Sequence, residues 1–336
     1  MSQSEGQQVG VIPTEGHRLV AVVVTHNRPD QLGVTLGRLL QAPAGALEAL
    51  VVVDNASGAE TQQLLAAQSD PRLVVLRSDE NLGGAGGFDL GMREAMGRFR
   101  PDWVVVMDDD ARPMPGTLEA FARADHQGRD AVAAAVYYPD GRICEMNRPS
   151  RNPFRSARIF LKTLFGGGRD GYHIAPAAYQ GAAQPIDIAS FVGLFISRRA
   201  IEATGFPDPS LFLYGDDVIY CLRMRRAGMA IDFDPALPFE HDCSTFQNDA
   251  RRVFNPLWKT YYSYRNGLIM YHEAAGLLFW PLLLVVVPKW LWASRRYGAD
   301  RGAYLQLTRM AIRHALTRAR RPDHRELVAL TEKLKG

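Results

Sequence analysis

The stretch WVVVMDDDARP, residues 103–113, sets three acidic residues directly after a run of apolar ones. An apolar run without alternation, such as residues 103–107, is typical of a strand that is buried on both faces of a sheet. The carboxylates of Asp108, Asp109 and Asp110 repel one another, so a strand end that concentrates them calls for a compensating cation. Hard divalent cations prefer carboxylate oxygen. The stretch therefore predicts a metal site built on Asp108 and Asp110 rather than a solvated acidic turn.

The alternation of strand and helix extends toward the N-terminus from this stretch. Apolar runs at 19–25, 49–53 and 73–76 predict three further strands, and the segments at 31–40 and 59–68 read as helices. This order is typical of an α/β layer fold with a parallel sheet. Ligands of such sheets bind at the carboxyl ends of the strands. We therefore expect the polar residues that follow the strands to form one site.

Polar residues end the first two of these strands. Thr25 to Arg28 follow the first strand, and Asp54 follows the second. The Asp54 carboxylate can accept hydrogen bonds from a ribose or a base edge; the alternative is that it caps the next helix.

The sequence NLGGAGGF, residues 81–88, predicts a glycine-rich loop that opens another helix, and it matches neither a P-loop nor GxGxxG. It is either a flexible turn or a place where the backbone approaches a ligand closely.

A second acidic pair, Asp216 and Asp217, opens a helix that we expect to run to about residue 227. Acidic residues at a helix start usually cap it or balance its dipole. The alternative is that one of them is the general base for an acceptor hydroxyl, kept ionised but weak by the helix N-terminus. His241, after a short strand predicted at 231–233, is either structural or the group that completes the carboxylate site. The spacing of His241 and Cys243 is not that of a zinc site.

Composition limits the class of protein. The chain has 336 residues, is 47% hydrophobic and 22% charged, and has a net charge of +3. These values are typical of a folded globular protein and argue against a nucleic-acid binder. Three cysteines without a CxxC pair support neither a disulfide framework nor a thiolate zinc site, and they favour a reducing compartment. Residues 1–17 predict a flexible tail without an apolar signal core, so we expect a protein that is not secreted.

Two later regions have a different character. Residues 140–185 are irregular, with four arginines at 147–158 and three glycines at 166–168, and predict a mobile loop or lid. Residues 276–287, GLLFWPLLLVVV, are apolar but shorter than the roughly 20 residues of a transmembrane helix. Between residues 289 and 325 there are ten Lys or Arg and two Asp. Apolar bulk, Trp and positive charge together indicate a membrane interface; the alternative is a buried helix that packs the C-terminal region.

Taken together, these motifs resemble those of the inverting glycosyltransferases of family 2, which have the GT-A fold, and among them the bacterial galactofuranosyltransferases. The resemblance covers roughly residues 19–270 and rests on His241 and on six motifs in family order: VVVTHNRPD at 22–30, VVVDN at 51–55, NLGGAGGF at 81–88, MDDDARPMP at 107–115, GDDVIYCLR at 215–223 and YYSYRNGL at 261–268. It implies a GT-A catalytic domain at 18–245 with a mostly parallel nucleotide-binding sheet flanked by helices. For residues 246–336 we expect a helical region that associates with a membrane through the apolar and basic stretch described above.

The resemblance also implies a role for each matching residue. The catalytic base would be Asp217, and Asp216 would hydrogen-bond acceptor or donor hydroxyls. The donor would be bound by Thr25, Arg28, Asp54, Asn81, Gly83, Gly84 and Asp109. A divalent metal, Mn²⁺ or Mg²⁺, would be held by Asp108, Asp110 and His241.

The activity implied is metal-dependent transfer of a sugar, galactofuranose from UDP-galactofuranose, to a hydroxyl of a glycan or lipid-linked glycan in cell-wall or surface polysaccharide synthesis. The alternatives are a rhamnosyltransferase that uses dTDP-rhamnose and a non-catalytic subunit that binds a nucleotide sugar. A nucleotidyltransferase would need a basic phosphate-binding segment that HNR at 26–28 does not supply. We expect a cytoplasmic protein in peripheral contact with the inner face of the membrane and no nucleic-acid partner; the sequence indicates no oligomeric state.

Overall fold

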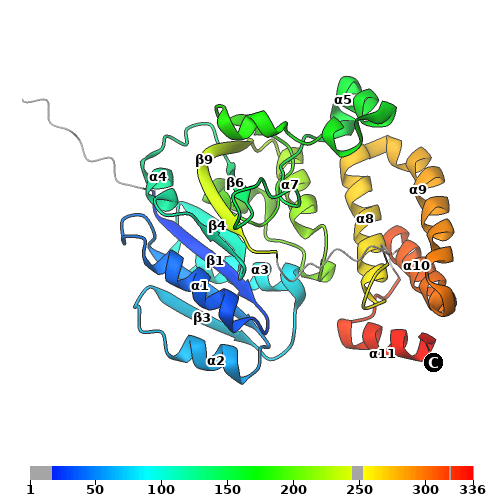
Figure 1. Ribbon diagram of the computed structural model, residues 1–336, viewed down its shortest axis with the longest axis horizontal. Coiled ribbons are helices and arrows are strands. Elements are labelled where there is room, and N and C mark those ends of the chain that lie inside the picture. The colour runs from blue at the N-terminus through cyan, green and yellow to red at the C-terminus, as the bar shows by residue number, and fades with distance from the viewer. Residues whose placement is uncertain (1–16, 244–252, 318, 336) are drawn as a thin grey trace, which may run out of the picture.

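The computed structural model of the protein describes residues 17–243, 253–317 and 319–335. An α/β part comes first in the chain, and a helical part that includes α8 to α11 lies beside it (Figure 1). The tail expected at residues 1–17 lies outside the described residues except for His17. The boundary expected between residues 245 and 246 also lies outside them.

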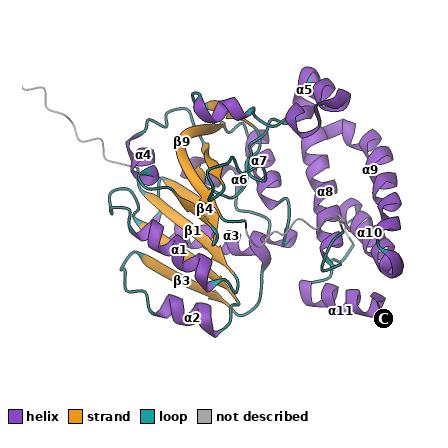
Figure 2. Cartoon of the chain, viewed as in Figure 1, coloured by secondary structure: helices purple, strands orange, loops and turns teal. Residues whose placement is uncertain are grey.

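The centre of the first part is one sheet (Figure 2). Its strands in the described residues are β1 Leu19–Thr25, β2 Ala49–Asn55, β3 Leu73–Ser78, β4 Trp103–Asp108, β5 Ala111–Pro113, β6 Ala131–Tyr137, β7 Gln184–Ile186, β8 Leu194–Ser197 and β9 Ile231–His241. They lie in the order β3-β2-β1-β4-β8-β6-β9-β5, and β7 pairs with β9. Strands β3, β2, β1 and β4 are parallel, and β8 is antiparallel to both β4 and β6. The predicted α/β fold with a mostly parallel sheet is confirmed, and β9 is longer than the strand predicted at 231–233.

Helices cover both faces of this sheet. The helices of the first part are α1 Pro29–Leu40, α2 Ala59–Ala66, α3 Gly83–Glu94, α4 Thr117–Arg123, α5 Ala157–Lys162, α6 Arg198–Thr204 and α7 Asp216–Arg226. Val20, Val22 and Val24 of β1 belong to the core that includes residues of α3, α6 and α7. Leu19, Ala21 and Val23 belong to the core under α1, α2 and α4. Because each face of β1 has its own apolar cover, the strand is apolar throughout.

The glycines at 83–87 lie inside a helix, so the prediction of a loop over residues 83–88 was wrong. Helix α3 begins at Gly83 and lies against the first two strands. A Cβ atom on Gly87 would come within 2.5 Å of Val24 Cγ1, and one on Gly91 within 2.5 Å of Val22 Cγ1. The glycines therefore let the helix axis approach the sheet more closely than side chains would permit.

We predict that Gly91→Ala destabilises the fold by about 1–3 kcal/mol, the usual cost of forcing extra atoms into a packed core. The matched control is Gly84→Ala in the same helix, because no heavy atom lies within 4 Å of its added Cβ. Relief of glycine's conformational entropy should make that variant as stable as the parent, or more stable by about 0.5–1 kcal/mol. Urea unfolding followed by circular dichroism measures both. Equal midpoints for the two variants would mean that α3 does not pack tightly on the sheet at Gly91.

The region expected to be a loop or lid, residues 140–185, contains helix α5 and several short 3₁₀ turns. It is tied to the helical part, because Asn152 Nδ2 donates to the Ala274 carbonyl over 2.9 Å. After α5 the side chains of Leu164 and Phe165 are exposed, at 62% and 79%. The region therefore has more regular structure than its composition suggested.

The helical part consists, in the described residues, of α8 Lys259–Ala275, α9 Phe279–Ala293, α10 Arg301–Leu316 and α11 His324–Lys335. Its core is aromatic: Tyr264 stacks on Trp290 with ring centroids 4.2 Å apart, and Tyr304 donates to the Trp290 carbonyl over 2.7 Å. Neither proline of the apolar segment breaks α9. Pro281 lies in the first turn, where no N–H is needed, and the helix continues past Pro288.

Candidate functional site

The carboxyl ends of three neighbouring strands bring predicted site residues together. In the sheet register Thr25 of β1 is opposite Asp54 of β2, and Val24 is opposite Asp108 of β4. Neighbouring strands lie about 4.8 Å apart, so these side chains share one edge of the sheet. This is the convergence that the strand pattern predicted.

Asp109 and Asp110 are buried and are held by residues that follow β1. Thr25 Oγ1 donates to Asp109 Oδ2 over 2.7 Å. Arg28 Nη1 lies 3.3 Å from Asp109 Oδ1 and 2.7 Å from Asp110 Oδ2. Of the residues predicted to bind the donor, Asp109 thus contacts both Thr25 and Arg28. The Arg28 side chain balances part of the negative charge while remaining 33% exposed.

The Asp108 carboxylate differs from those of Asp109 and Asp110 in its hydrogen bonding and in its pKa. Burial, and then the charge of Asp110, raise the pKa of Asp108 to about 7. Within the described residues no hydrogen-bond donor reaches this carboxylate. A carboxylate that is crowded by another and lacks a donor is stabilised by a cation.

His241 reaches the acidic stretch through strand pairing. Strand β5 begins one residue after Asp110 and pairs with β9 so that Ala111 is opposite His241. His241 Nε2 lies 3.1 Å from Asp110 Oδ1, and Nδ1 lies 2.7 Å from Asn147 Oδ1. Burial alone would lower the pKa of His241, but the hydrogen bond and charge of Asp110 outweigh it and raise this pKa to about 10. The imidazole therefore lies in a strongly negative field.

Asp108, Asp110 and His241 carry the kinds of donor atom that a divalent cation accepts. Asp108 and Asp110 offer carboxylate oxygens, and His241 offers a ring nitrogen that already points at Asp110. Mn²⁺ accepts oxygen and imidazole ligands, whereas Mg²⁺ favours oxygen. A cation among these groups would relieve the repulsion that raises the Asp108 pKa.

Asp54 makes a hydrogen bond in the loop between β2 and α2, and Asn81 makes one in the loop between β3 and α3. Asp54 Oδ1 accepts from the Ser57 N–H over 2.9 Å. The N-cap of α2 is Gly58, so Asp54 does not cap that helix. Asn55 donates to Asn81 Oδ1 over 3.2 Å and to the Gly83 carbonyl over 3.0 Å. The amide of Asn55 thus fixes the start of α3 against the end of β2.

Gly83 allows a close approach to the loop before α7. Its φ is +70°, and a Cβ there would lie 2.1 Å from the Phe212 carbonyl oxygen. Asn27, Ala56, Phe212 and Tyr214 also have positive φ values, between 57° and 70°. Non-glycine residues with positive φ values have a strained backbone and gather at functional sites. Among the described residues, and apart from its own helix backbone and chain neighbours, a Cβ on Gly84 would meet no heavy atom within 4 Å.

Asp216 and Asp217 begin α7, as predicted, but the N-cap is Gly215. Asp217 Oδ1 accepts from the Val218 N–H over 2.7 Å. Burial raises the pKa of Asp217 to about 6, and burial together with the charge of Asp217 raises the pKa of Asp216 well above its usual value. The expectation of a weak base at a helix N-terminus was wrong, because burial outweighs the backbone hydrogen bonds. The charge of Asp108 also raises the Asp216 pKa, so the acidic stretch after β4 and the acidic pair of α7 interact electrostatically.

Two residues of α8 position this acidic pair, and sequence reasoning missed them. Arg265 is buried and donates to the carbonyls of Ser210 and Leu211 over 2.6 and 3.0 Å. Asn266 Nδ2 donates to the carbonyls of Leu211, Leu213 and Tyr214 over 2.8–2.9 Å. The helical part therefore holds the loop that leads into α7. The only sequence signal was their place in the motif YYSYRNGL.

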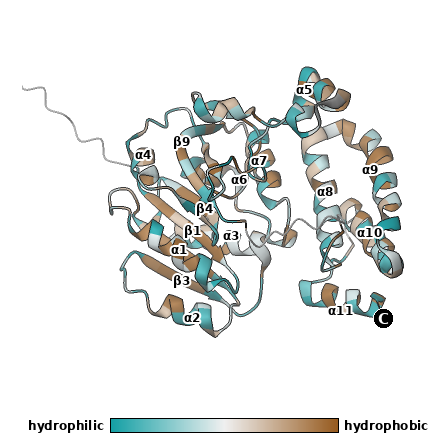
Figure 3. Cartoon of the chain, viewed as in Figure 1, coloured by the Kyte–Doolittle hydropathy of each residue, from teal (hydrophilic) through white to brown (hydrophobic). Residues whose placement is uncertain are grey.

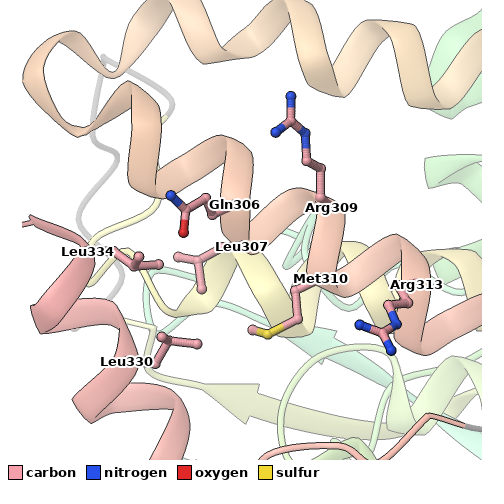
Figure 4. A pocket seen from close by; sticks show the side chains of 7 residues that line it. All are labelled: Gln306, Leu307, Arg309, Met310, Arg313, Leu330 and Leu334. Atoms are coloured by element: carbon pink, nitrogen blue, oxygen red, sulfur yellow. The ribbon is translucent and has the colours of Figure 1, made fainter.

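A separate pocket of about 380 Å³ lies between α10 and α11 (Figure 4). Its lining is Gln306, Leu307, Arg309, Met310, Arg313, Leu330 and Leu334. None of the predicted site residues lines it, so it is distinct from the site at the strand ends.

Comparison with known proteins adds to this geometry. The profile of Glycosyl transferase family 2 matches residues 20–182. Galactofuranosyltransferase GlfT1 of Mycolicibacterium smegmatis is 28% identical over 310 residues, which cover 89% of this chain and 97% of that protein. GlfT1 of Mycobacterium tuberculosis is 32% identical over 228 residues, which cover 67% of this chain and 70% of that protein. The mannosyltransferase PcManGT from Pyrobaculum calidifontis, solved with GDP-Man and Mn²⁺, aligns with a TM-score of 0.51 and 19% identity over 96% of this chain and 81% of its own.

The central sheet with its flanking helices and the likeness to this mannosyltransferase show that the α/β part has the GT-A fold. The chain belongs to glycosyltransferase family 2. The resemblance drawn from the motifs is thereby confirmed at the level of family and fold.

Proposed function

We propose that the protein transfers galactofuranose from UDP-galactofuranose to a hydroxyl of a glycan or lipid-linked glycan acceptor, with inversion of the anomeric centre, in cell-wall or surface polysaccharide synthesis. The observation that supports it most is the sheet register, which brings Thr25, Asp54 and Asp108 to one edge of the sheet. The charge of Asp108 also raises the Asp216 pKa, which links this edge to the acidic pair of α7. The choice of sugar follows the names of the two GlfT1 relatives.

In the proposed reaction the acceptor oxygen attacks the anomeric carbon, the bond from that carbon to UDP breaks, and Asp217 accepts the hydroxyl proton. A carboxylate with a pKa of about 6 is ionised at neutral pH and is a stronger base than an ordinary aspartate. A single displacement needs one base and no covalent intermediate, unlike retaining glycoside hydrolysis. Asp216 would hydrogen-bond hydroxyls of the acceptor or donor.

The donor would lie along the strand ends. Thr25, Arg28 and Asp54 would hold the nucleotide, and Asp109 would face the ribose or the sugar. The donor pocket would be lined by Asn81, Gly83 and Gly84. The open space around Gly84 supports this placement.

Asp108, Asp110 and His241 Nε2 would hold Mn²⁺ or Mg²⁺. Such an ion, when bound, supplies Lewis-acid stabilisation of the charge on the departing diphosphate. Arg28, which now contacts Asp110 over 2.7 Å, would then be available to the diphosphate instead.

Donor selection tests the proposal. With Mn²⁺ present, we expect UDP release from UDP-galactofuranose to exceed that from UDP-galactopyranose by at least about 10-fold, since a site built around one set of hydroxyls rejects another. Chelation of the metal with EDTA should abolish the release, and Mn²⁺ should restore it. Calorimetry with each donor gives binding independently of turnover.

The other outcomes point to specific alternatives. Preference for dTDP-rhamnose would overturn the choice of sugar and leave the base and metal residues in place. Binding of a donor without release of nucleotide, even with acceptor, would indicate a non-catalytic subunit. Release of pyrophosphate would overturn glycosyl transfer itself.

We further propose that α9 lies on the inner face of the cytoplasmic membrane, where a lipid-linked acceptor would be presented. One stretch, Lys259–Arg296, is long and apolar enough to cross a bilayer by length and composition. It turns back at Gly276, where φ is +54°, so that α8 and α9 run side by side (Figure 1). The 15 residues of α9 extend about 22 Å, less than the roughly 30 Å of a hydrocarbon core. These lengths support a peripheral helix rather than a span.

The exposed side of α9 supports the same placement. The structure describes every residue of α9, and of these only Phe279 is buried, so α9 is not the buried helix of the alternative interpretation. Leu277, just before α9, is 89% exposed, and Trp280, Leu284 and Trp292 on it are 63%, 78% and 57% exposed. Figure 3 shows the apolar colouring along this helix. Apolar side chains with tryptophan and flanking arginines are typical of an interfacial helix.

A further inference from the structure

Two cysteines that are far apart in the sequence meet at His241. Strands β6 and β9 are neighbours, and the chain after β6 turns back so that the Cys144 N–H donates to the Val136 carbonyl over 2.9 Å. Cys243 lies two residues beyond His241 at the end of β9. Spacing along the chain showed no sign of a thiolate site, because Cys144 reaches the site through the sheet.

The ligand atoms of the three side chains lie within 4.8 Å of one another, close to the spacing of a tetrahedral metal site. Cys144 Sγ and Cys243 Sγ are 3.9 Å apart, and His241 Nδ1 is 3.2 Å from Cys243 Sγ and 4.0 Å from Cys144 Sγ. Zinc bonds of about 2.3 Å to sulfur and about 2.0 Å to nitrogen at tetrahedral angles imply edges of roughly 3.8 Å between sulfurs and roughly 3.5 Å between sulfur and nitrogen. The observed distance between the sulfurs matches the first edge, and the two distances from sulfur to Nδ1 lie on either side of the second.

We propose that Cys144, Cys243 and His241 Nδ1 bind a thiophilic divalent cation such as Zn²⁺, separate from the cation at Asp108 and Asp110. Two thiolates and one imidazole are a ligand set that zinc prefers and that Mg²⁺ and Mn²⁺ do not.

The surroundings supply the remaining parts of a metal site. Asn147 Oδ1 accepts from the Cys144 thiol over 2.9 Å and lies 2.7 Å from His241 Nδ1, so an oxygen is at hand that would move away from both atoms to serve as a fourth ligand. A pocket of about 310 Å³, lined by Tyr138, Pro139, Asp140, Arg142, Asp242 and Cys243, gives access to the ion. On the far side of the ring, Nε2 lies 3.1 Å from Asp110 Oδ1. A carboxylate that accepts from the other ring nitrogen is the usual partner of a histidine bound to zinc.

A consequence for catalysis rests on the proposed function. When Nδ1 binds the thiophilic ion, the proton of the neutral ring is on Nε2 and is donated to Asp110. The ring then has no lone pair left for the proposed catalytic metal, which keeps only Asp108 and Asp110 of its three proposed ligands. Occupancy of the thiolate site would therefore weaken the catalytic site.

Cobalt spectroscopy tests the thiolate site without any sugar donor. The full chain, reduced with a phosphine and freed of metal, is titrated with Co²⁺. We expect an intense near-ultraviolet thiolate-to-cobalt band that saturates at one equivalent and disappears when Zn²⁺ displaces Co²⁺. Cys243→Ala, a change at a partly exposed position, should abolish the band, and so should Cys144→Ala.

Two control variants make the result specific. Cys221→Ala removes the third cysteine, which donates to the Ala189 carbonyl outside the cluster, and should keep the band. Asp108→Asn should also keep it, because oxygen ligands give no thiolate band. A parent protein without the band, or cysteine variants that retain it, would overturn the proposal. A failed donor assay would not affect this result, since the spectrum reports coordination alone.

Discussion

Asp217→Asn is expected to lower kcat by about 10²–10⁴-fold, the usual contribution of a positioned general base. Asparagine keeps the oxygen that accepts from the Val218 N–H over 2.7 Å, so the start of α7 should be unchanged. What is lost is the site that accepts the hydroxyl proton. Turnover of UDP-galactofuranose by parent and variant measures the loss, and calorimetry with UDP should give the same affinity for both.

The pH profile gives this prediction a second readout. The base works only when ionised, and burial raises the pKa of Asp217 to about 6. Activity of the parent protein should therefore fall as the pH drops through about 6. The residual activity of Asp217→Asn should not show this fall at low pH. Because a raised carboxyl pKa means that the folded state disfavours the ionised form, the substitution should not reduce stability at pH 7.

Asp216→Asn is the matched control for the assignment of the base. The two carboxyls are adjacent on α7, and the pKa of Asp216 is raised well above its usual value by burial and then by the charge of Asp217. If Asp217→Asn retained most activity and Asp216→Asn did not, the base would be Asp216. Retention of activity by both would contradict catalysis by this pair.

The α/β part could be predicted from the sequence because its signals are local. The run at 19–25 is apolar since each face of β1 has its own core, and this pattern needs no knowledge of distant residues. The acidic stretch at 108–110 was recognisable for a similar reason, because three adjacent carboxylates after a buried strand repel one another and so indicate a bound cation. Given the strand pattern, their meeting with Thr25 and Asp54 followed from the common edge of parallel strands.

The features that could not be predicted depend on contacts between distant segments. The glycines of NLGGAGGF suggest a loop, yet packing against Val22 and Val24 makes them helical. Arg265 and Asn266 act on the loop at 210–214 through backbone carbonyls, for which a sequence has no signal. Cys144 joins His241 only because β6 and β9 are neighbours. The raised pKa of Asp217 also depends on burial, which the motif alone does not reveal.

Leu277→Glu combined with Leu284→Glu is expected to lower association with anionic phospholipid vesicles by about 100-fold or more. Burying each leucine side chain contributes about 1.5–3 kcal/mol, and the added carboxylates would also be repelled by an anionic surface. Both side chains are exposed, at 89% and 78%, so the fold should tolerate the change. Co-sedimentation with vesicles, at equal protein stability, measures the effect.

The matched control places two charges on the α/β part instead. Val34 of α1 and Val75 of β3 are exposed apolar residues, at 51% and 41%, and the variant Val34→Glu with Val75→Glu carries the same added charge. It should bind vesicles nearly as the parent does, because those positions are not on the apolar helix. Equal loss in both variants would mean that net charge, rather than α9, governs the association. The Leu277→Glu, Leu284→Glu variant should still turn over the donor in solution, because α9 carries none of the residues assigned to the donor. This measurement separates loss of membrane contact from loss of catalysis.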